Sequence, residues 1–319
     1  MKRMNCLLSL GAFLLAANAF AQDYPSKPLR FVVPFPPGGV DTVGRIVAQQ
    51  LSTVVGQPVV VDNRGGAAGT IGTTIAVNAR ADGYTVLFSN ISLAINVSLF
   101  PKLPYDTLKD LAPISLIGRQ PNLLVVHPAV AAKTVKELVA LAKSQPGKLN
   151  YGSGGANTML AIELFKLGTG TDIVGVPYNG IGPAMIALLG GQLQMTMSPM
   201  VSSLPHVTSG KLRALGISDV RRSTLLPDIP TLQEAGVPGY EFFNWYGVFV
   251  PSATPRATIQ VLNKAVIRAL DSPALKKQFS AQGLESKSTS PEEFAAYLNS
   301  EVGKFTSVVK AAGMKPEQL

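Results

Sequence analysis

The sequence is poor in the side chains that most often perform catalysis or bind metals: it has one cysteine and two histidines. Cys6 lies in the first 21 residues, so the rest of the chain can form no disulfide and offers no thiol. His127 and His206 stand alone, outside any H-E-x-x-H motif or cysteine-histidine cluster. An enzyme that uses a serine-lysine pair or carboxylates alone remains an alternative, but no motif in the sequence indicates one, and we expect no metal, no cofactor and no enzymatic activity.

The amino terminus has the pattern of a secretory signal peptide. The basic pair Lys2-Arg3 precedes the apolar run Leu7–Ala17, and Ala19-Phe20-Ala21 follows as an A-x-A cleavage site. The apolar run is too short for a transmembrane helix, which needs about 20 residues. We predict that residues 1–21 are removed after Ala21, which leaves 298 of the 319 residues as a periplasmic protein.

Basic side chains outnumber acidic ones, and the net charge of +9 falls to +7 when Lys2 and Arg3 are removed. The lysines and arginines are scattered, and an exported protein does not meet nucleic acid, so we expect no nucleic-acid partner. A diffuse positive field attracts small anions, although the same charge also serves solubility.

Short apolar segments alternate with amphipathic ones, which is typical of an α/β fold. Leu29–Val33 has the pattern of a strand, and the helical spacing of Val43–Val55 follows it and ends at Gly56. The alternation predicts βαβ units and largely parallel sheets. Further strands are expected at Pro58–Val61, Thr85–Phe88, Leu123–Val126, Ile173–Val176, Leu193–Met197, Arg213–Ile217 and Tyr246–Val250. Three pairs have the spacing of helix capping boxes: Thr134 with Glu137, Thr231 with Glu234, and Ser290 with Glu293.

The carboxy-terminal part, from Pro255, is helical nearly to its end, which indicates that the chain returns to the domain in which it began. We expect two α/β lobes and a monomeric protein. The first lobe comprises residues 22–121 plus 251–319, and the second comprises residues 122–250, including the crossover strands. Ligands in open α/β sheets bind at the carboxyl ends of strands, so a cleft between the lobes is the expected site. A hinge in the connecting strands would let the cleft close.

The first candidate site is the loop Phe35-Pro36-Pro37-Gly38-Gly39, between the first strand and the first helix. Its glycines let backbone N–H groups approach a ligand, and the positive end of the helix favours an anion. The alternative is a tight turn between strand and helix. Phe35 could pack against an apolar ligand body or belong to the core, and Asp41 could cap the helix instead of touching ligand.

The second candidate site is Asn150–Thr158, which also precedes a helix. It is not a dinucleotide fingerprint, because Asn157 takes the place of the third glycine, nor a nucleophile elbow, because Tyr151 stands where glycine is required. We call Phe35–Gly39 the first nest and Asn150–Thr158 the second nest, because each is a glycine-rich loop that exposes backbone N–H groups before a helix. One nest in each lobe would suit the two ends of a dicarboxylate, although a loop that binds no ligand remains an alternative. The candidate donors here are the side chains of Ser153, Asn157 and Thr158 and the backbone of Gly154, Gly155 and Ala156.

Other segments place small polar groups at strand ends, where they could line the cleft. The candidates are Ser89, Asn90, Ser92, Tyr178 and Ser198. Gly65–Gly69 lacks the Gly-Lys-Ser/Thr ending of a phosphate loop, so we interpret it as a turn.

Short motifs also occur in a fixed order along nearly the whole mature chain. They are Phe35–Gly39 with Asp41, Gly56–Val61, Asp82–Thr85, Leu103–Asp106, Pro146–Gly152, Val176–Tyr178, Gly190–Gln192, Gly210–Leu215, Leu226–Thr231 and Glu234–Gly236, ahead of Trp245. Together they resemble the Bug, or TctC-like, receptors of tripartite tricarboxylate transporters. The resemblance implies a type II periplasmic-binding-protein fold, no enzymatic activity and no metal. It also implies delivery of a carboxylate to a two-subunit membrane permease that an ion gradient drives.

The resemblance further implies how the ligand is held. In that family the loop after the first strand and the glycine-rich segment of the second lobe hold a carboxylate, partly through ordered water. The matching positions here are Phe35–Gly39 and Ser153–Thr158. This sequence departs from the family in a shorter second nest and in Gln194 and Ser198, which replace the usual acidic residues. Both lie in Leu193–Ser198, a strand end that we expect to reach the cleft. We therefore expect a mono- or dicarboxylate without an amino group. Two other functions remain as alternatives to transport: a receptor that presents its ligand to a sensor protein, and a periplasmic hydrolase.

Overall fold

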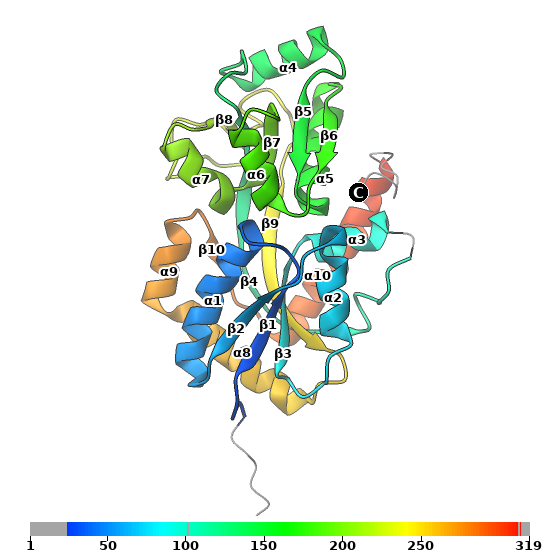
Figure 1. Cartoon of the computed structure of the whole chain (residues 1–319), viewed down its shortest axis with the longest axis vertical. Coiled ribbons are helices and arrows are strands. Elements are labelled where there is room, and N and C mark those ends of the chain that lie inside the picture. Colours follow the sequence, from blue (N-terminus) through cyan, green and yellow to red (C-terminus); the bar gives the residue numbers. More distant parts are fainter. Residues whose placement is uncertain (1–23, 101, 312, 314–319) are drawn as a thin grey trace, which may run out of the picture.

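The computed structural model describes residues 24–100, 102–311 and 313, which form two α/β lobes joined by two long strands (Figure 1). The predicted signal peptide lies outside the described residues. The lower lobe in Figure 1 contains three mutually parallel strands, β1 (Leu29–Val33), β2 (Val59–Asn63) and β3 (Thr85–Asn90). Its helical elements are α1 (Gly39–Val55), the 3-10 turn Ala67–Gly69, α2 (Thr70–Val77), α3 (Ser92–Leu99), α8 (Arg256–Asp271), α9 (Pro273–Ser280) and α10 (Pro291–Ala311).

The upper lobe has its own sheet and helices (Figure 1). Its strands are β5 (Asn150–Ser153), β6 (Val174–Pro177), β7 (Met195–Pro199) and β8 (Arg213–Ile217). Its helices are α4 (Val135–Ser144), α5 (Ala156–Thr169), α6 (Ile181–Leu189) and α7 (Met200–Thr208). Strand β5 runs parallel to both β6 and β7. The helices α5, α6 and α7 therefore all begin at the carboxyl ends of these strands, which face the lower lobe.

Two long strands connect the lobes: β4 (Leu111–Val126) and β9 (Phe243–Pro251). From Leu111 to Pro121, β4 pairs antiparallel with β9, and from Asn122 onward it pairs with β7 and β8. One strand thus serves both sheets, and the change of partner falls at Pro121–Asn122. The strand order is β2-β1-β3-β9-β4-β7-β5-β6, while β8 and the short β10 (Glu285–Ser286) also pair with β4.

The α/β class is confirmed, but the expectation of largely parallel sheets was wrong for the strands that join the lobes. β4 leaves the lower lobe and β9 returns to it, so the two must run in opposite directions. The predicted strand Leu123–Val126 is only the end of β4, whose earlier part is interrupted by Pro113 and Pro121. β9 pairs with β4 over its whole length and with β3 from Tyr246 to Phe249, in the sheet of the first lobe, although its residues up to Val250 were assigned to the second. The division into lobes at those residue numbers stays a prediction.

Local sequence signals account for several element boundaries. Gly56 ends α1 in the left-handed conformation, with φ of 69°. The capping box of Ser290 and Glu293 is complete at the start of α10. At the start of α4, Thr134 Oγ1 accepts the N–H of Glu137, but the Glu137 carboxylate accepts the N–H of Lys133 instead of that of Thr134. Thr231 and Glu234 also exchange both hydrogen bonds, but the segment after them is a turn and not the predicted helix.

The core of the lower lobe lies on both faces of β1 and β3. Phe31 packs against Phe88 with ring centroids 5.4 Å apart, and Phe88 stacks on Tyr246 of β9 at 5.9 Å. Burying each such side chain contributes about 1.5–3 kcal/mol. This stack holds the connecting strand β9 to the rigid centre of the lower lobe. Among the described residues, no helix is long and apolar enough to cross a membrane.

Candidate ligand-binding site between the lobes

A small cavity of about 20 Å³ lies where the two lobes meet. The first turns of α1, from the lower lobe, and of α5 and α6, from the upper lobe, contribute to its wall, and so does Pro199, the N-cap residue of α7. Asn90, the last residue of β3, completes it from below. The lining residues are Phe35, Pro36, Gly38, Gly39, Val40, Asn90, Gly154, Asn157, Ile181 and Pro199.

The four helix N-termini carry no side-chain caps. Their N-cap residues are Gly38, Gly155, Gly180 and Pro199, and none makes a capping hydrogen bond through a side chain. The first N–H groups of a helix have no acceptor within that helix, and they form the positive end of its dipole. Four such ends around one cavity favour an anion. The three glycines have φ between 100° and 142°, a region that other residues rarely adopt.

Some of these N–H groups are already bonded within the protein. Asn157 of α5 donates to Ser92 Oγ at 3.4 Å, and Val201 of α7 donates to Gln120 Oε1 at 2.8 Å. Just before the N-cap of α5, Gly154 donates to Thr158 Oγ1 at 2.7 Å. Thr158 therefore shapes the second nest and does not line the cavity. The first-turn N–H groups of α1 and α6 are therefore the main backbone donors left for a ligand.

Asn90 presents an unpaired donor to the cavity. Its side chain is 1% exposed, and its Oδ1 accepts the N–H of Ser92 at 3.1 Å. Its Nδ2 is buried and has no hydrogen-bond partner among the described residues. A buried donor without an acceptor costs about 1–3 kcal/mol, so an acceptor supplied by a ligand would restore that free energy.

A chain of buried side chains runs from the cavity into the connecting strands. Ser92 Oγ donates to Asn157 Oδ1 (3.3 Å), and Asn157 Nδ2 donates to Asn244 Oδ1 (3.3 Å). Tyr246 Oη then accepts from Asn244 Nδ2 (2.9 Å) and from Gln120 Nε2 (2.6 Å). Burial raises the pKa of Tyr246, so its hydroxyl is neutral. The chain joins α3, α5, β9 and β4, and so links both lobes to the hinge strands.

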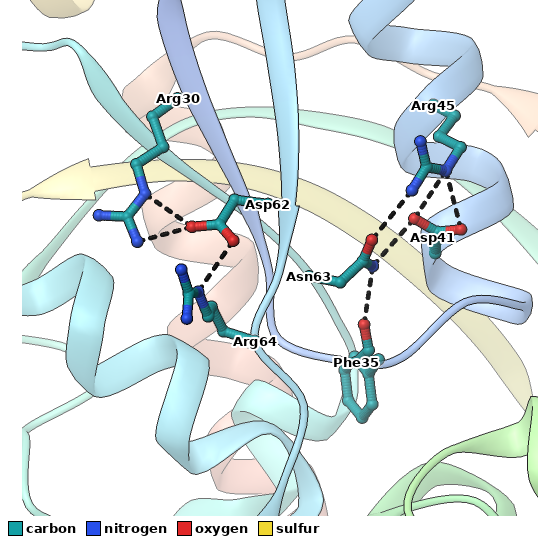
Figure 2. A network of polar contacts seen from close by, with 7 residues as sticks. All are labelled: Arg30, Phe35, Asp41, Arg45, Asp62, Asn63 and Arg64. Atoms are coloured by element: carbon teal, nitrogen blue, oxygen red, sulfur yellow. Dashed lines mark hydrogen bonds and ion pairs between the residues drawn. The ribbon is translucent and has the colours of Figure 1, made fainter.

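The loop of the first nest is held from behind by a second network (Figure 2). Asn63 Nδ2 donates to the carbonyl of Phe35 and to Asp41 Oδ1, both at 2.9 Å. Arg45 Nε lies 3.0 Å from both carboxylate oxygens of Asp41. Asp41 therefore does not cap α1, and its carboxylate is paired with Arg45 and Asn63. It anchors the loop that contains Phe35.

Beside this network, Asp62 joins two arginines (Figure 2). It accepts from Arg30 at 2.6 and 2.8 Å and from Arg64 at 2.8 Å. Burial alone would raise the pKa of Asp62, but the hydrogen bonds from both arginines outweigh it and hold the pKa below its usual value. The group ties the end of β2 to β1, next to the first nest.

The two lobes touch through glycines at the cavity edge. A Cβ on Gly39 would stand 2.6 Å from Cγ2 of Ile181, and one on Gly180 would stand 2.7 Å from Cγ of Pro36. Both distances are shorter than a normal carbon contact, so only glycine permits this approach. Helix α6 thus closes directly onto the first nest.

The structure brings seven of the predicted residues to the cavity: Phe35, Pro36, Gly38, Gly39, Asn90, Gly154 and Asn157. Gly155 lies close behind, where a Cβ would be 3.4 Å from the Phe35 ring. Of the other candidates, Ser92 and Thr158 bond to cavity residues, and the Ser198 hydroxyl bonds to Ser203. Ser89, Ser153, Ala156 and Tyr178 lie beside the cavity elements without lining it. Their role in binding a ligand stays a prediction.

One expectation about the cleft was wrong. Gln194 precedes β7 and lies level with Asn150, at the opposite end of the sheet from the cavity. Its Oε1 accepts the N–H of Asn150 at 2.8 Å. Two lining residues were not among the candidates: Val40 and Ile181. Each lies in the first turn of a helix that follows a glycine N-cap, which is the signal that could have identified them. Pro199 also lines the cavity and directly follows the candidate Ser198.

Comparison with known proteins agrees with this architecture. Residues 43–314 match the tripartite tricarboxylate transporter family receptor, TctC. Protein BugT of Bordetella pertussis is 38% identical over 99% of both chains. The structure of Rpa4515 of R. palustris with adipate superposes with a TM-score of 0.89 at 33% identity, over 91% of this chain and 99% of that one.

A second solved structure, MatC from Rhodopseudomonas palustris with bound malate, has a TM-score of 0.86 at 31% identity, over 90% of this chain and 100% of that one. These similarities confirm the type II periplasmic-binding-protein fold and the resemblance carried by the sequence motifs. The chain therefore belongs to the TctC family of periplasmic solute receptors.

Proposed function

We propose that this receptor captures a small organic carboxylate without an amino group and delivers it to the permease of a tripartite tricarboxylate transporter. The observation that supports it most directly is the meeting of four uncapped helix N-termini and the free Asn90 amide at one cavity. The adipate and malate in two related structures also support a carboxylate ligand.

The energetics of this arrangement suit an anion. A negative charge at a helix N-terminus gains about 0.3–1 kcal/mol from each helix, and more in partly buried geometries. Hydrogen bonds to a charged acceptor contribute about 1.5–3 kcal/mol each. Asn90 Nδ2 from the lower lobe and the α6 backbone from the upper lobe approach the cavity from opposite sides. A carboxylate between them would hold the lobes together.

The same site disfavours an ammonium group. The cavity lining contains no aspartate or glutamate among the described residues. Asp41 is the acidic residue in the first turn of α1, and its carboxylate is already paired with Arg45 and Asn63. A buried ammonium without a counter-ion is strongly disfavoured. The proposed ligand class is therefore mono- or dicarboxylates that lack an amino group.

Binding requires the lobes to separate and close again. A cavity of about 20 Å³ has room for roughly one water molecule, which is less than a four-carbon acid needs. The chain passes between the lobes in β4 and β9. Other contacts between the lobes are made by glycines at the cavity edge and by side-chain hydrogen bonds. A hinge at Pro121–Asn122, where β4 changes partners, would open the site.

Calorimetry on the mature protein, freed of bound ligand by unfolding and refolding, tests the ligand class. The panel is succinate, malate and adipate against aspartate and glutamate. We expect at least one unaminated acid to bind more tightly than both amino acids, and mass spectrometry to recover it unchanged. Tighter binding of aspartate or glutamate than of every unaminated acid would contradict the proposal.

Delivery is tested separately in cells. A strain that lacks this receptor should lose uptake of the radiolabelled acid that binds best, and a plasmid copy should restore it. Unchanged uptake in the receptor-deficient strain, with binding intact in the purified protein, would contradict delivery to the permease and leave the binding role standing.

A further inference from the structure

A larger groove of about 410 Å³ opens between the lobes next to the cavity. Gly38 and Gly39 of the lower lobe and Ile181 of the upper lobe line both spaces. The rest of the groove is formed mainly by aliphatic side chains of α6 and α7, among them Met185, Ile186 and Leu189. The cavity and the groove are therefore neighbours, separated by one contact between the lobes.

That separating contact is a thin one. It consists of Gly38 and Gly39 against Ile181 and Gly182, where a Cβ on Gly38 would be 3.1 Å from the Cα of Gly182. Gly38 and Gly39 add no side chain to the wall on the side of the lower lobe, where Ile181 faces them, so a small separation of the lobes would join the two spaces. Ser202 lies at this junction, 3.2 Å from where a Cβ of Gly39 would stand, and its Oγ is buried without a hydrogen-bond partner among the described residues.

The groove carries almost no charge. The described residues that line it include no Asp, Glu, Lys or Arg. Its one titratable side chain is His206, and burial, together with the nearby charge of Lys211, lowers the pKa of that imidazole. His206 is therefore neutral at neutral pH. Ile186 is 73% exposed, so the groove also presents apolar surface to solvent that a ligand could cover.

We infer that the groove is a subsite for the apolar body of an amphipathic carboxylate. The acid group lies at the helix N-termini and Ser202, and an alkyl chain or aryl ring extends past Gly38–Gly39 over α6. A cavity of about 150 Å³ lined by Leu, Ile and Phe accommodates benzene, so 410 Å³ is ample. The inference rests on the proposed function and names its ligand class: monocarboxylates with an aliphatic or aromatic tail.

Calorimetry with butanoate, hexanoate, octanoate and phenylacetate, beside succinate and malate, tests the subsite. Burial of each methylene should tighten binding about fourfold, so octanoate should bind far more tightly than butanoate. The double variant Ile186→Gln with Leu189→Gln should lower octanoate affinity at least tenfold and leave succinate and malate affinity unchanged. The matched control is Leu167→Gln with Val174→Gln, which changes two partly exposed apolar residues of the same lobe outside the groove and should alter neither.

The outcomes separate this inference from the proposed function. If succinate or malate binds but octanoate is no tighter than butanoate, the subsite is overturned and the carboxylate receptor stands. If no carboxylate binds, both fall. If the Ile186/Leu189 variant loses uptake in cells while its octanoate affinity is unchanged, the groove contacts the permease and the subsite is overturned.

Discussion

Gly182 of α6 lies against the carbonyl group of Pro37 in the opposite lobe, so closely that a Cβ at position 182 would overlap that oxygen. Gly182 has ordinary helical backbone angles, so alanine suits it locally. The glycine is required only because the lobes meet here. A substitution at Gly182 can therefore impair closure of the cleft without lowering the stability of the upper lobe.

We predict that Gly182→Ala weakens ligand binding without destabilising the protein. Alanine in a helix is up to about 1 kcal/mol more favourable than glycine, so thermal stability should be equal or higher. Incomplete closure should remove one or more charge-assisted hydrogen bonds, which weakens binding tenfold to a hundredfold. Calorimetry and thermal melts measure both. Gly303→Ala in α10, where a Cβ meets nothing within 4 Å, is the control, and an unchanged affinity in Gly182→Ala would show that this contact does not govern closure.

Asn90→Asp should abolish most binding of carboxylates. The substitution keeps Oδ1 as the acceptor for Ser92 N–H, but it replaces the free Nδ2 donor with a negative oxygen. Loss of a hydrogen bond to a charged group alone costs about 1.5–3 kcal/mol, or at least tenfold in affinity. Asn78→Asp, an exposed site at the end of α2, makes the same change of charge and should bind normally. If Asn90→Asp and Asn78→Asp bind carboxylates with equal affinity, Asn90 does not contact the ligand.

Tyr246→Phe should destabilise the protein. It removes the acceptor of Gln120 Nε2 and Asn244 Nδ2 and leaves two buried donors unpaired, at about 1–3 kcal/mol for each. Urea unfolding followed by fluorescence measures the loss. The half-buried Tyr297 has no hydrogen bond from its hydroxyl among the described residues, so Tyr297→Phe should be near neutral. If both variants unfold at the same urea concentration, the hydrogen-bond chain through the hinge contributes nothing.

Asp62 should contribute stability that depends on pH. Its pKa in the folded protein is below the ordinary 3.8, because the hydrogen bonds from Arg30 and Arg64 outweigh burial. The contribution is therefore complete above the ordinary value and is lost as pH falls through the lower, folded value. Asp62→Asn should lower stability at pH 7 by less than about 1 kcal/mol, because the arginines are half exposed. Melts at pH 7 and pH 3 should show the difference shrinking, and a constant difference would contradict it.

The mature protein should begin at Gln22. Ala19-Phe20-Ala21 is the cleavage signal, and removal of residues 1–21 also removes Cys6. Intact-mass measurement of the periplasmic protein checks this, with cyclised glutamine allowed at the new terminus. A mature pool that retains the leader, or that reacts with a thiol reagent, would contradict the prediction.

Much of the local structure could be predicted because it depends on neighbours in the sequence. Leu29–Val33 and Arg213–Ile217 are strands with the predicted bounds. The end of α1 at Gly56, the side-chain cap of Thr134 and the capping box of Ser290 depend on residues no more than four positions apart. Glycines that start helices also marked the first nest and the second.

The rest depended on contacts between distant segments. The sequence pattern predicted only the last four residues of β4, because Pro113 and Pro121 interrupt the earlier part. Pairing with β9 keeps that earlier part extended. Gln194 was predicted at the end of β7 that reaches the cavity, but it lies at the opposite end. A short apolar run in the sequence does not show where strand pairing begins. The sequence left open whether Asp41 caps α1 or contacts a ligand, and its pairing with Asn63 and Arg45 shows that it does not cap the helix.

The sequence by itself determined the α/β class, the family, and the two glycine-rich helix starts that face an anion, because these depend on residue types and on spacing along the chain. Only the tertiary structure decided that four helix starts meet at one cavity and that Gly182 meets Pro37 across the cleft. It also decided that Asn90 Nδ2 finds no acceptor in the part of the chain that the structure describes. Those facts depend on how the hinge strands set one lobe against the other. Close packing across a cleft is a property of two surfaces together, and no local pattern in either segment specifies it.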